Sequence, residues 1–276
     1  MSFMEKLHQA WDRNNSLVCV GLDPDLHKLP ETVLRHEPKP IFAFNKAIID
    51  ATHDLVCCYK PQMAYYAGYG AEDELSMTIE YIAKNYPLVP VILDAKRGDI
   101  GSTAEMYARE AFVRYGADAV TVNPYMGTDN LKPFLDHADR GVVILCRTSN
   151  PSSAELQELV SGDKQIFQYV AEYAVTRWNY NHNVMLVVGA TFPEELGRIR
   201  AQCPELPFLV PGVGAQGGDV RKVLENGQTA DGKGLVINSS RGIIYASKGP
   251  DFAAAARNAA IELRDEINRC RREVAR

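Results

Sequence analysis

The segment DAKRGD at residues 94–99 carries three charged side chains whose spacing could support proton transfer. It follows an apolar run at residues 89–93, which predicts that the segment lies at the end of a buried strand. Residues two apart on a strand share a face, so Asp94 and Lys96 should point the same way, with Asp99 in the next turn. Flanking carboxylates favour the charged form of Lys96 and make it a proton donor, whereas the Schiff-base lysine of a class I aldolase needs the opposite environment. The alternative is an ion-pair network at the rim of a barrel, without catalysis.

A glycine-rich loop, PGVGAQGGD at residues 211–219, could bind a phosphate group. Its glycines would let backbone N–H groups approach an anion at a helix N-terminus. Arg241, which follows the next strand, could bind the same phosphate with two hydrogen bonds. The loop contains a GxGxxG pattern, but the dinucleotide fingerprint belongs in the first strand–helix turn, and six units precede this loop. An ordinary turn with a surface arginine is the alternative interpretation.

Short apolar runs alternate with longer segments of helical character along the chain. Eight runs are candidate strands, at residues 17–22, 56–59, 89–93, 119–122, 142–145, 184–188, 208–210 and 235–237. The segments between them fit helices, at residues 41–55, 71–85, 102–115, 128–136, 153–181, 193–202, 218–226 and 251–272. Continuous apolar runs suit strands buried on both faces, so we expect a closed (β/α)8 TIM barrel that uses residues 1–276 as a single domain. A doubly wound open sheet is the alternative.

Polar or charged residues follow almost every candidate strand. They include Asp23, Lys60, Asp94, Asn123, Arg147, Ser149 and Arg241. In a barrel the carboxyl ends of all strands open onto one face, where active sites are built. So many polar residues at one face predict a catalytic or binding site there.

The composition excludes several classes of protein. With 46% hydrophobic residues, the 276-residue chain can bury a large core and is not expected to be disordered. A net charge of −5 argues against a general nucleic-acid partner, and no apolar run approaches the roughly 18 residues that a membrane span requires. The six cysteines and six histidines show no metal-ligand spacing, so we expect reduced thiols, no metal site and a cytoplasmic protein.

These segments together resemble the orotidine 5′-phosphate decarboxylase family. The resemblance runs from GLDPD at residues 21–25 to SSRGI at residues 239–243, and DAKRGD fits the family's Asp-x-Lys-x-x-Asp pattern. The PGVGAQGGD loop is close to the family's phosphate loop, and the chain length is similar to that of the longer bacterial subgroup. The resemblance implies a (β/α)8 barrel that converts orotidine 5′-monophosphate to UMP and CO2 in pyrimidine biosynthesis without a cofactor.

The resemblance also implies roles for individual residues. The implied catalytic array is Asp94, Lys96, Asp99 and Lys60, with Lys96 as the proton donor. Asp99, Ile100 and Thr103 would reach into the neighbouring subunit's site, which makes a homodimer the active unit. The implied substrate-binding residues are Asp23 at the ribose hydroxyls, Asn123 where some relatives carry His, Ser149 at the pyrimidine edge, Gln216 between base and phosphate, and Pro211, Gly217, Gly218 and Arg241 around the phosphate.

The implied reaction makes a specific demand on the site. Loss of CO2 from C6 of the pyrimidine leaves a carbanion without an electron sink, so a fixed ammonium must stabilise and protonate it. Two other functions stay open. A Mg²⁺-dependent sugar-phosphate decarboxylase or synthase of the same superfamily shares the Asp-x-Lys-x-x-Asp arrangement, although no acidic residue such as Glu neighbours Lys60 in the sequence. A non-catalytic phosphate-ligand binding protein is the other, although binding alone needs no Asp–Lys–Asp array.

Overall fold

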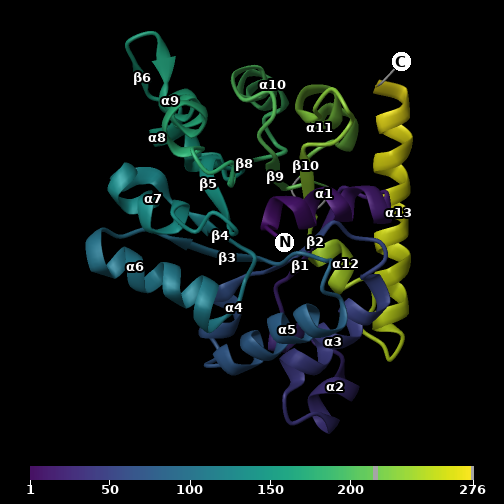
Figure 1. Cartoon of the computed structure of the whole chain (residues 1–276). Helices are drawn as coiled ribbons and strands as arrows, with labels where there is room; N and C mark the ends of the chain where they lie inside the picture. Colours follow the sequence, from purple (N-terminus) through teal and green to yellow (C-terminus); the bar gives the residue numbers. More distant parts are fainter. Residues whose placement is uncertain (214–216, 275–276) are drawn as a thin grey trace.

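Parallel strands form a barrel, which confirms the predicted (β/α)8 fold (Figure 1). The computed structural model describes residues 1–213 and 217–274. The barrel strands are β1 (Val18–Leu22), β2 (Cys58–Pro61), β3 (Ile92–Arg97), β4 (Ala119–Val122), β5 (Gly141–Arg147), β8 (Val184–Val188), β9 (Phe208–Pro211) and β10 (Leu235–Ser239). They follow the order β2-β1-β10-β9-β8-β5-β4-β3, and parallel bridges from Tyr59 to Val91 and from Gln62 to Asp94 join β2 to β3. The open-sheet alternative is therefore wrong.

Helices surround the strands on the outside of the barrel (Figure 1). The α-helices are α1 (Phe3–Asn14), α2 (Glu31–His36), α3 (Pro40–Thr52), α4 (Met63–Ala67), α5 (Glu72–Asn85), α6 (Gly101–Arg109), α7 (Thr128–Leu135), α8 (Ala154–Gln157), α9 (Ile166–Tyr173), α10 (Pro193–Gln202), α11 (Val220–Gly227), α12 (Arg241–Ile244) and α13 (Phe252–Val274). Short 3₁₀ turns occupy Leu26–Lys28, Pro124–Met126 and Pro151–Ser153, and π-helical turns at Glu110–Arg114 and Ala174–Trp178 extend α6 and α9. Because all eight strands are parallel, their carboxyl ends lie at the same end of the barrel.

The segment after β5 differs from the single helix expected at residues 153–181. It contains α8, then a hairpin of β6 (Val160–Ser161) and β7 (Lys164–Gln165), and then α9. The hairpin turns at Gly162, whose φ of 66° lies in the left-handed region and interrupts a helix. Arg147, at the end of β5, is fully buried, and its guanidinium pairs with Glu158 of this segment and with Glu195 of α10. A buried ion pair of this kind has no periodic spacing in the sequence, so the sequence could not predict it.

Helix α1 closes the amino end of the barrel. The Trp11 Nε1 group donates a hydrogen bond to the carbonyl of Leu235, the first residue of β10, at 3.1 Å. Phe3 packs on Gly141, the first residue of β5, where an added Cβ would lie 2.3 Å from the Phe3 ring. Both contacts are made at strand starts, so the carboxyl end is the end that remains open for a functional site.

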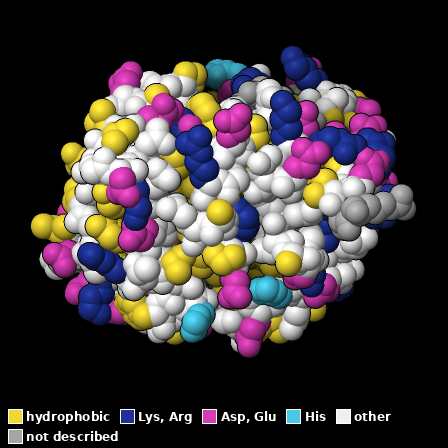
Figure 2. All heavy atoms as spheres, turned by 90° about the horizontal axis from the view of Figure 1, so that it is seen from above, with side chains coloured by type: hydrophobic (Ala, Val, Ile, Leu, Met, Phe, Trp, Pro, Cys, Tyr) yellow, Lys and Arg dark blue, Asp and Glu magenta, His cyan; other side chains and the backbone are white. Residues whose placement is uncertain are grey.

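Charged side chains of both signs are interspersed on the face of the molecule that Figure 2 shows. Lys and Arg alternate there with Asp and Glu, in keeping with the small net charge of −5. All six cysteines are buried and unpaired. Within the described ranges, no helix combines the length and the apolar character that a membrane crossing requires.

Replacing Gly141 with alanine should destabilise the barrel, because the new methyl group would collide with the Phe3 ring and with Ala119. Overpacking of this kind costs roughly 1–3 kcal/mol of unfolding free energy, which urea denaturation would measure. Gly242→Ala is the matched control, since its added Cβ would meet Ser239 Oγ at 3.4 Å, an ordinary contact distance. Equal denaturation midpoints for the two variants would contradict the packing of α1 against β5.

Candidate active site

The carboxylate of Asp94, on β3, lies at the centre of a hydrogen-bonded charge cluster. The Nζ atom of Lys60, on β2, lies 3.0 Å from Asp94 Oδ2, and Lys96 Nζ lies 2.6 Å from Oδ1. Gln62 Nε2 donates to Oδ2 at 3.0 Å, and Thr121 Oγ1 donates to Oδ1 at 2.9 Å. Each carboxylate oxygen therefore has one charged and one neutral donor, so this buried negative charge is well compensated.

Lys60 is buried at the base of the cluster, with a side chain only 5% exposed. A second carboxylate, that of Asp23 after β1, lies beside it, with Asp23 Oδ1 3.9 Å from Lys60 Nζ. This Asp23 oxygen is buried and has no hydrogen-bond donor. The Asp23 side chain as a whole is 18% exposed, so its carboxylate is an acceptor to which a ligand hydroxyl at the barrel mouth could donate.

Burial and ion pairing act in opposite directions on the protonation of this cluster. Burial alone would raise the pKa of Asp94, but Lys60 and Lys96 outweigh burial and hold that pKa well below its usual range. Burial alone would lower the pKa of Lys60, but Asp94 and Asp23 outweigh burial and hold that pKa well above its usual range. At neutral pH the cluster therefore contains an ionised Asp94 and a protonated Lys60.

The backbone of β3 bulges where it carries Lys96. The register of β3 against β4 shifts between Leu93 and Arg97. Lys96 has a φ of 47°, in the left-handed region that non-glycine residues rarely adopt. Asp94 and Lys96 thus meet through a bulge, rather than through the regular strand alternation expected from the sequence. The side chain of Lys96 is 47% exposed, against 5% for Lys60, so Lys96 is the lysine that a ligand can reach.

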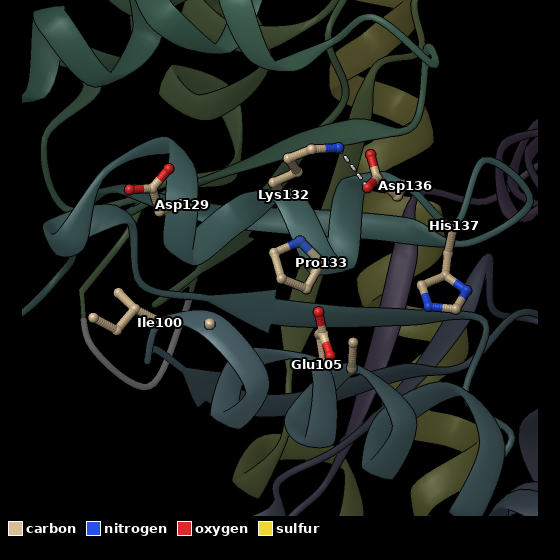
Figure 3. A pocket seen from close by; sticks show the side chains of 9 residues that line it. Ile100, Glu105, Asp129, Lys132, Pro133, Asp136 and His137 are labelled. Atoms are coloured by element: carbon tan, nitrogen blue, oxygen red, sulfur yellow. Dashed lines mark hydrogen bonds and ion pairs between the residues drawn. The ribbon is translucent and has the colours of Figure 1, made fainter.

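Asp99 does not join the cluster of its own chain. Its amide donates to Asn130 Oδ1 at 3.0 Å, and its Oδ1 accepts from the Ile100 amide at 2.8 Å. Across the described part of the chain, Asp99 forms no ion pair. Ile100 is 56% exposed and lines a groove between α6 and α7 (Figure 3), and Thr103 is exposed on α6. These three residues therefore lie apart from the Asp94 cluster within one chain.

Asn123 and Ser149 follow β4 and β5, at the same end of the barrel as the cluster. Asn123 Oδ1 accepts from the Tyr125 amide at 3.1 Å, so this side chain caps a 3₁₀ turn. Ser149 is half-buried, and its carbonyl accepts from the Thr191 hydroxyl at 3.3 Å. The loops after β5 and β8 are joined by this bond, which places Ser149 at the rim of the barrel mouth.

The predicted phosphate-binding residues follow β9 and β10, which are neighbours in the sheet. Pro211 ends β9, and Gly217 and Gly218 precede α11, with Gly217 at a φ of 86°. Gln216 lies outside the described residues. Arg241 is exposed at the start of α12 and forms no ion pair with the described residues, so its guanidinium is available to an anion.

The sequence patterns do not single out three residues that support this site. Gln62 directly follows β2, so the strand-end rule that selects Lys60 could have found it. Thr121 lies inside β4 and looks like an ordinary strand residue. Asn130, on α7, reaches the Asp99 amide from a separate helix, and no spacing in the sequence indicates that contact.

The arrangement suits proton transfer to a small ligand at the mouth of the barrel. Lys96 offers an exposed ammonium that is fixed by Asp94. Asp23 and Arg241 follow the adjacent strands β1 and β10, and their exposed groups offer an acceptor for hydroxyls and a cation for an anionic group. In the described ranges, no group of three or more His, Cys, Asp or Glu side chains is arranged to hold a metal ion.

An eight-stranded parallel barrel with an Asp-x-Lys-x-x-Asp segment at the end of its third strand defines a class of barrel enzymes. The family described as "Orotidine 5'-phosphate decarboxylase / HUMPS family" matches residues 16–257, and the chain belongs to this family. A protein of Cellvibrio japonicus named orotidine 5′-phosphate decarboxylase is 58% identical over 269 residues, which cover 97% of this chain and 98% of that protein.

Solved structures agree with this assignment. The structure of Leishmania donovani OMP decarboxylase matches with a TM-score of 0.85 and 43% identity, covering 98% of this chain and 99% of that chain. The structure of Leishmania donovani UMP synthase matches with a TM-score of 0.87 and 44% identity, and the match spans 98% of this chain but only 57% of that longer chain.

Lys60→Met should destabilise the protein by roughly 3–5 kcal/mol at neutral pH, because it removes one partner of a buried ion pair. The pKa of Asp94 is lowered on folding, so its contribution to stability is present above about pH 3.9 and is lost as the pH falls further. The pKa of Lys60 is raised, so its contribution is present below about pH 10.4 and is lost at higher pH.

Urea denaturation of wild type and Lys60→Met across pH 3–8 would test this. The difference between the two proteins should shrink as the pH falls below about 4. Lys132→Met is the control, since the Lys132–Asp136 pair has side chains that are 62% and 49% exposed and should matter little. A difference that stays constant down to the acid limit would contradict the pairing.

Proposed function

We propose that this chain decarboxylates orotidine 5′-monophosphate to UMP and CO2, without a cofactor, as a step of pyrimidine biosynthesis. The observation that carries the proposal is the Asp94 carboxylate held between buried Lys60 and exposed Lys96 at the carboxyl end of the barrel. Curated relatives at 54–58% identity that span nearly the whole chain are named orotidine 5′-phosphate decarboxylase, which supports this substrate.

Lys96 is the proposed proton donor. When the bond between C6 and the carboxylate breaks, the electron pair stays on C6 and CO2 leaves. The Lys96 ammonium stabilises that pair and transfers a proton to C6, and the resulting neutral amine regains a proton from water. Lys96 fits this role because it is 47% exposed, whereas Lys60 is 5% exposed and bound to Asp94.

Asp94 has two proposed roles in the same step. It orients the ammonium groups of Lys60 and Lys96, at 3.0 and 2.6 Å from its two oxygens. Its lowered pKa keeps it ionised when substrate binds, so a negative charge lies near the departing carboxylate. When the carboxylate leaves as neutral CO2, its electrostatic repulsion with Asp94 is lost. The Lys96 ammonium stays beside C6.

The proposed substrate-binding groups lie around this array at the barrel mouth. They are Asp23 for the ribose hydroxyls, Asn123 and Ser149 near the base, Gln216 between base and phosphate, and Pro211, Gly217, Gly218 and Arg241 for the phosphate. Two observations support this arrangement: the Asp23 side chain is 18% exposed beside Lys60, and Arg241 has no ion pair among the described residues. The phosphate is remote from C6, so its binding energy would serve to fix the base over Lys96.

The active unit is proposed to be a homodimer in which Asp99, Ile100 and Thr103 complete the partner's site. Asp99 makes no ion pair in the described part of its own chain, although it belongs to the Asp-x-Lys-x-x-Asp segment. Large apolar side chains are exposed just before α6, on α6 itself, on the π turn after it and on the 3₁₀ turn after β4. They are Ile100, Met106, Val113, Tyr125 and Met126. Exposed apolar side chains gathered in this way favour a protein–protein interface.

The same proposal includes a single domain over residues 1–276 and a cytoplasmic location. One eight-stranded sheet with one surrounding set of helices supports a single domain. Six buried cysteines without a disulfide support a reducing compartment.

The direct test is to add orotidine 5′-monophosphate to the purified protein and to follow the loss of its ultraviolet absorbance. We expect UMP and CO2 as products, at a rate that EDTA does not change. A strict requirement for Mg²⁺ would favour a sugar-phosphate enzyme of the same superfamily. Tight binding of UMP without turnover would favour a non-catalytic binding protein.

Lys96→Ala should lower kcat by roughly 10²- to 10⁴-fold, because it removes the proton donor. Affinity for UMP, measured by calorimetry, should change far less, since the ribose and phosphate contacts remain. Lys46→Ala is the matched control, because Lys46 is 46% exposed and pairs with Asp50 on α3, away from the site. Turnover retained by Lys96→Ala would refute the assignment of the proton donor.

Mixing Lys96→Ala chains with Asp99→Ala chains should restore activity that neither variant has alone. In a mixed dimer, one of the two sites would receive both an intact Lys96 and an intact Asp99 from the partner. Native mass spectrometry would confirm that mixed dimers form, and the decarboxylation assay would measure recovery. Mixed dimers without recovered activity would contradict the shared site.

A further inference from the structure

The bulge in β3 disturbs the regular hydrogen-bond ladder beside Lys96. Leu93 and Arg97 of β3 pair with residues of β4 that lie immediately before and immediately after Thr121. The segment between them, residues 94–96, therefore lies opposite Thr121 alone. A buried backbone N–H group in such a bulge needs an acceptor outside the ladder.

The Thr121 hydroxyl supplies that acceptor and also binds the central carboxylate. It accepts a hydrogen bond from the Lys96 amide at 2.9 Å and donates one to Asp94 Oδ1 at 2.9 Å. The same Asp94 oxygen lies 2.6 Å from Lys96 Nζ. One hydroxyl thus holds both the backbone from which the Lys96 side chain extends and the carboxylate that binds its ammonium.

This double contact matters because the backbone of Lys96 is strained. Its φ of 47° lies in the left-handed region, where a residue other than glycine persists only when its surroundings hold it. Thr121 is only 1% exposed, so bulk water cannot replace its hydroxyl. Without the hydroxyl, the Lys96 amide loses its acceptor and Asp94 loses one of four donors, so the carboxylate and the ammonium can shift together.

We propose that Thr121 is a positioning residue for the decarboxylation, which fixes the Lys96 ammonium at the place where the carbanion forms. The inference rests on the proposed function of Lys96. Thr121 is buried beneath the cluster and lies among none of the groups proposed to bind substrate. Its loss should therefore act on the chemical step rather than on nucleotide binding, because a misplacement of about 1 Å at a reacting group can cost about 100-fold in rate.

Thr121→Val is the test, because valine keeps the shape of threonine and removes only the hydrogen-bonding group. We expect kcat for orotidine 5′-monophosphate to fall by roughly 10- to 100-fold. The dissociation constant of UMP, measured by calorimetry, should change by less than about threefold. Thr121→Ser keeps the hydroxyl and should keep kcat within about threefold of the wild-type value.

Thr52→Val is the matched control for loss of a buried threonine hydroxyl. Thr52 is fully buried on α3, and its hydroxyl donates to the Ile48 carbonyl at 2.7 Å. The same hydroxyl forms a second hydrogen bond, to Tyr59 Oη, at 2.8 Å. Neither partner belongs to the Asp94 cluster. This variant should lower the denaturation midpoint but leave kcat unchanged, which separates positioning from general stability.

The outcomes distinguish this inference from the proposed function. If wild type and Thr52→Val produce no UMP, the proposed function fails. If both turn over and Thr121→Val keeps the wild-type kcat, the positioning role of Thr121 is wrong. An equal loss of kcat in Thr121→Val and Thr121→Ser would also overturn it, because the hydroxyl would then not be the cause. If Thr121→Val does not fold, Thr121→Ala is measured against Thr121→Ser and is interpreted in the same way.

Discussion

The ion pairing of one buried carboxylate, Asp94, with two lysines is the interaction on which the rest of the site depends. Lys60 is 5% exposed, and its charge is tolerated there because Asp94 lies 3.0 Å away. Asp94 in turn stays ionised because two ammonium groups and two neutral donors surround it. Removing one partner would leave an uncompensated charge inside the barrel mouth, so the groups of this cluster must be present together.

The barrel topology brings these groups together from separate parts of the chain. Strands β2 and β4 lie on either side of β3, so Lys60 and Thr121 approach Asp94 from opposite directions. Helix α1 fills the amino end, where Trp11 binds the first residue of β10, and all strand ends that carry polar residues open at the other end. A second buried ion pair lies at the rim of the barrel. There the guanidinium of Arg147 pairs with Glu158 and Glu195, which fixes the segment after β5.

The barrel strands and most of the site residues at their carboxyl ends could be predicted from the sequence, because burial leaves a clear pattern. Strands of a parallel barrel are buried on both faces, so each appears as a continuous apolar run, and the polar residue after each run marks the open end. The bulge at Lys96 could not be predicted, since strand alternation gives the same facing for Asp94 and Lys96. The role of Thr121 depends on that bulge, so no sequence pattern indicates it. The run Ser161-Gly162-Asp163 is a turn signal that could have predicted a break in residues 153–181, but the two-residue strands β6 and β7 are too short to show a strand pattern.

The most direct test of the Asp94 cluster is the ionisation of Asp94 itself, measured by ¹³C NMR of its carboxyl carbon as a function of pH. We expect no titration of this carbon from neutral pH down to about pH 3, with ordinary surface aspartates titrating near pH 3.9 in the same spectra. Asp94→Asn identifies the resonance. A midpoint for Asp94 at or above about pH 3.9 would show that the two lysines do not hold this charge, and would contradict the proposed basis of the site.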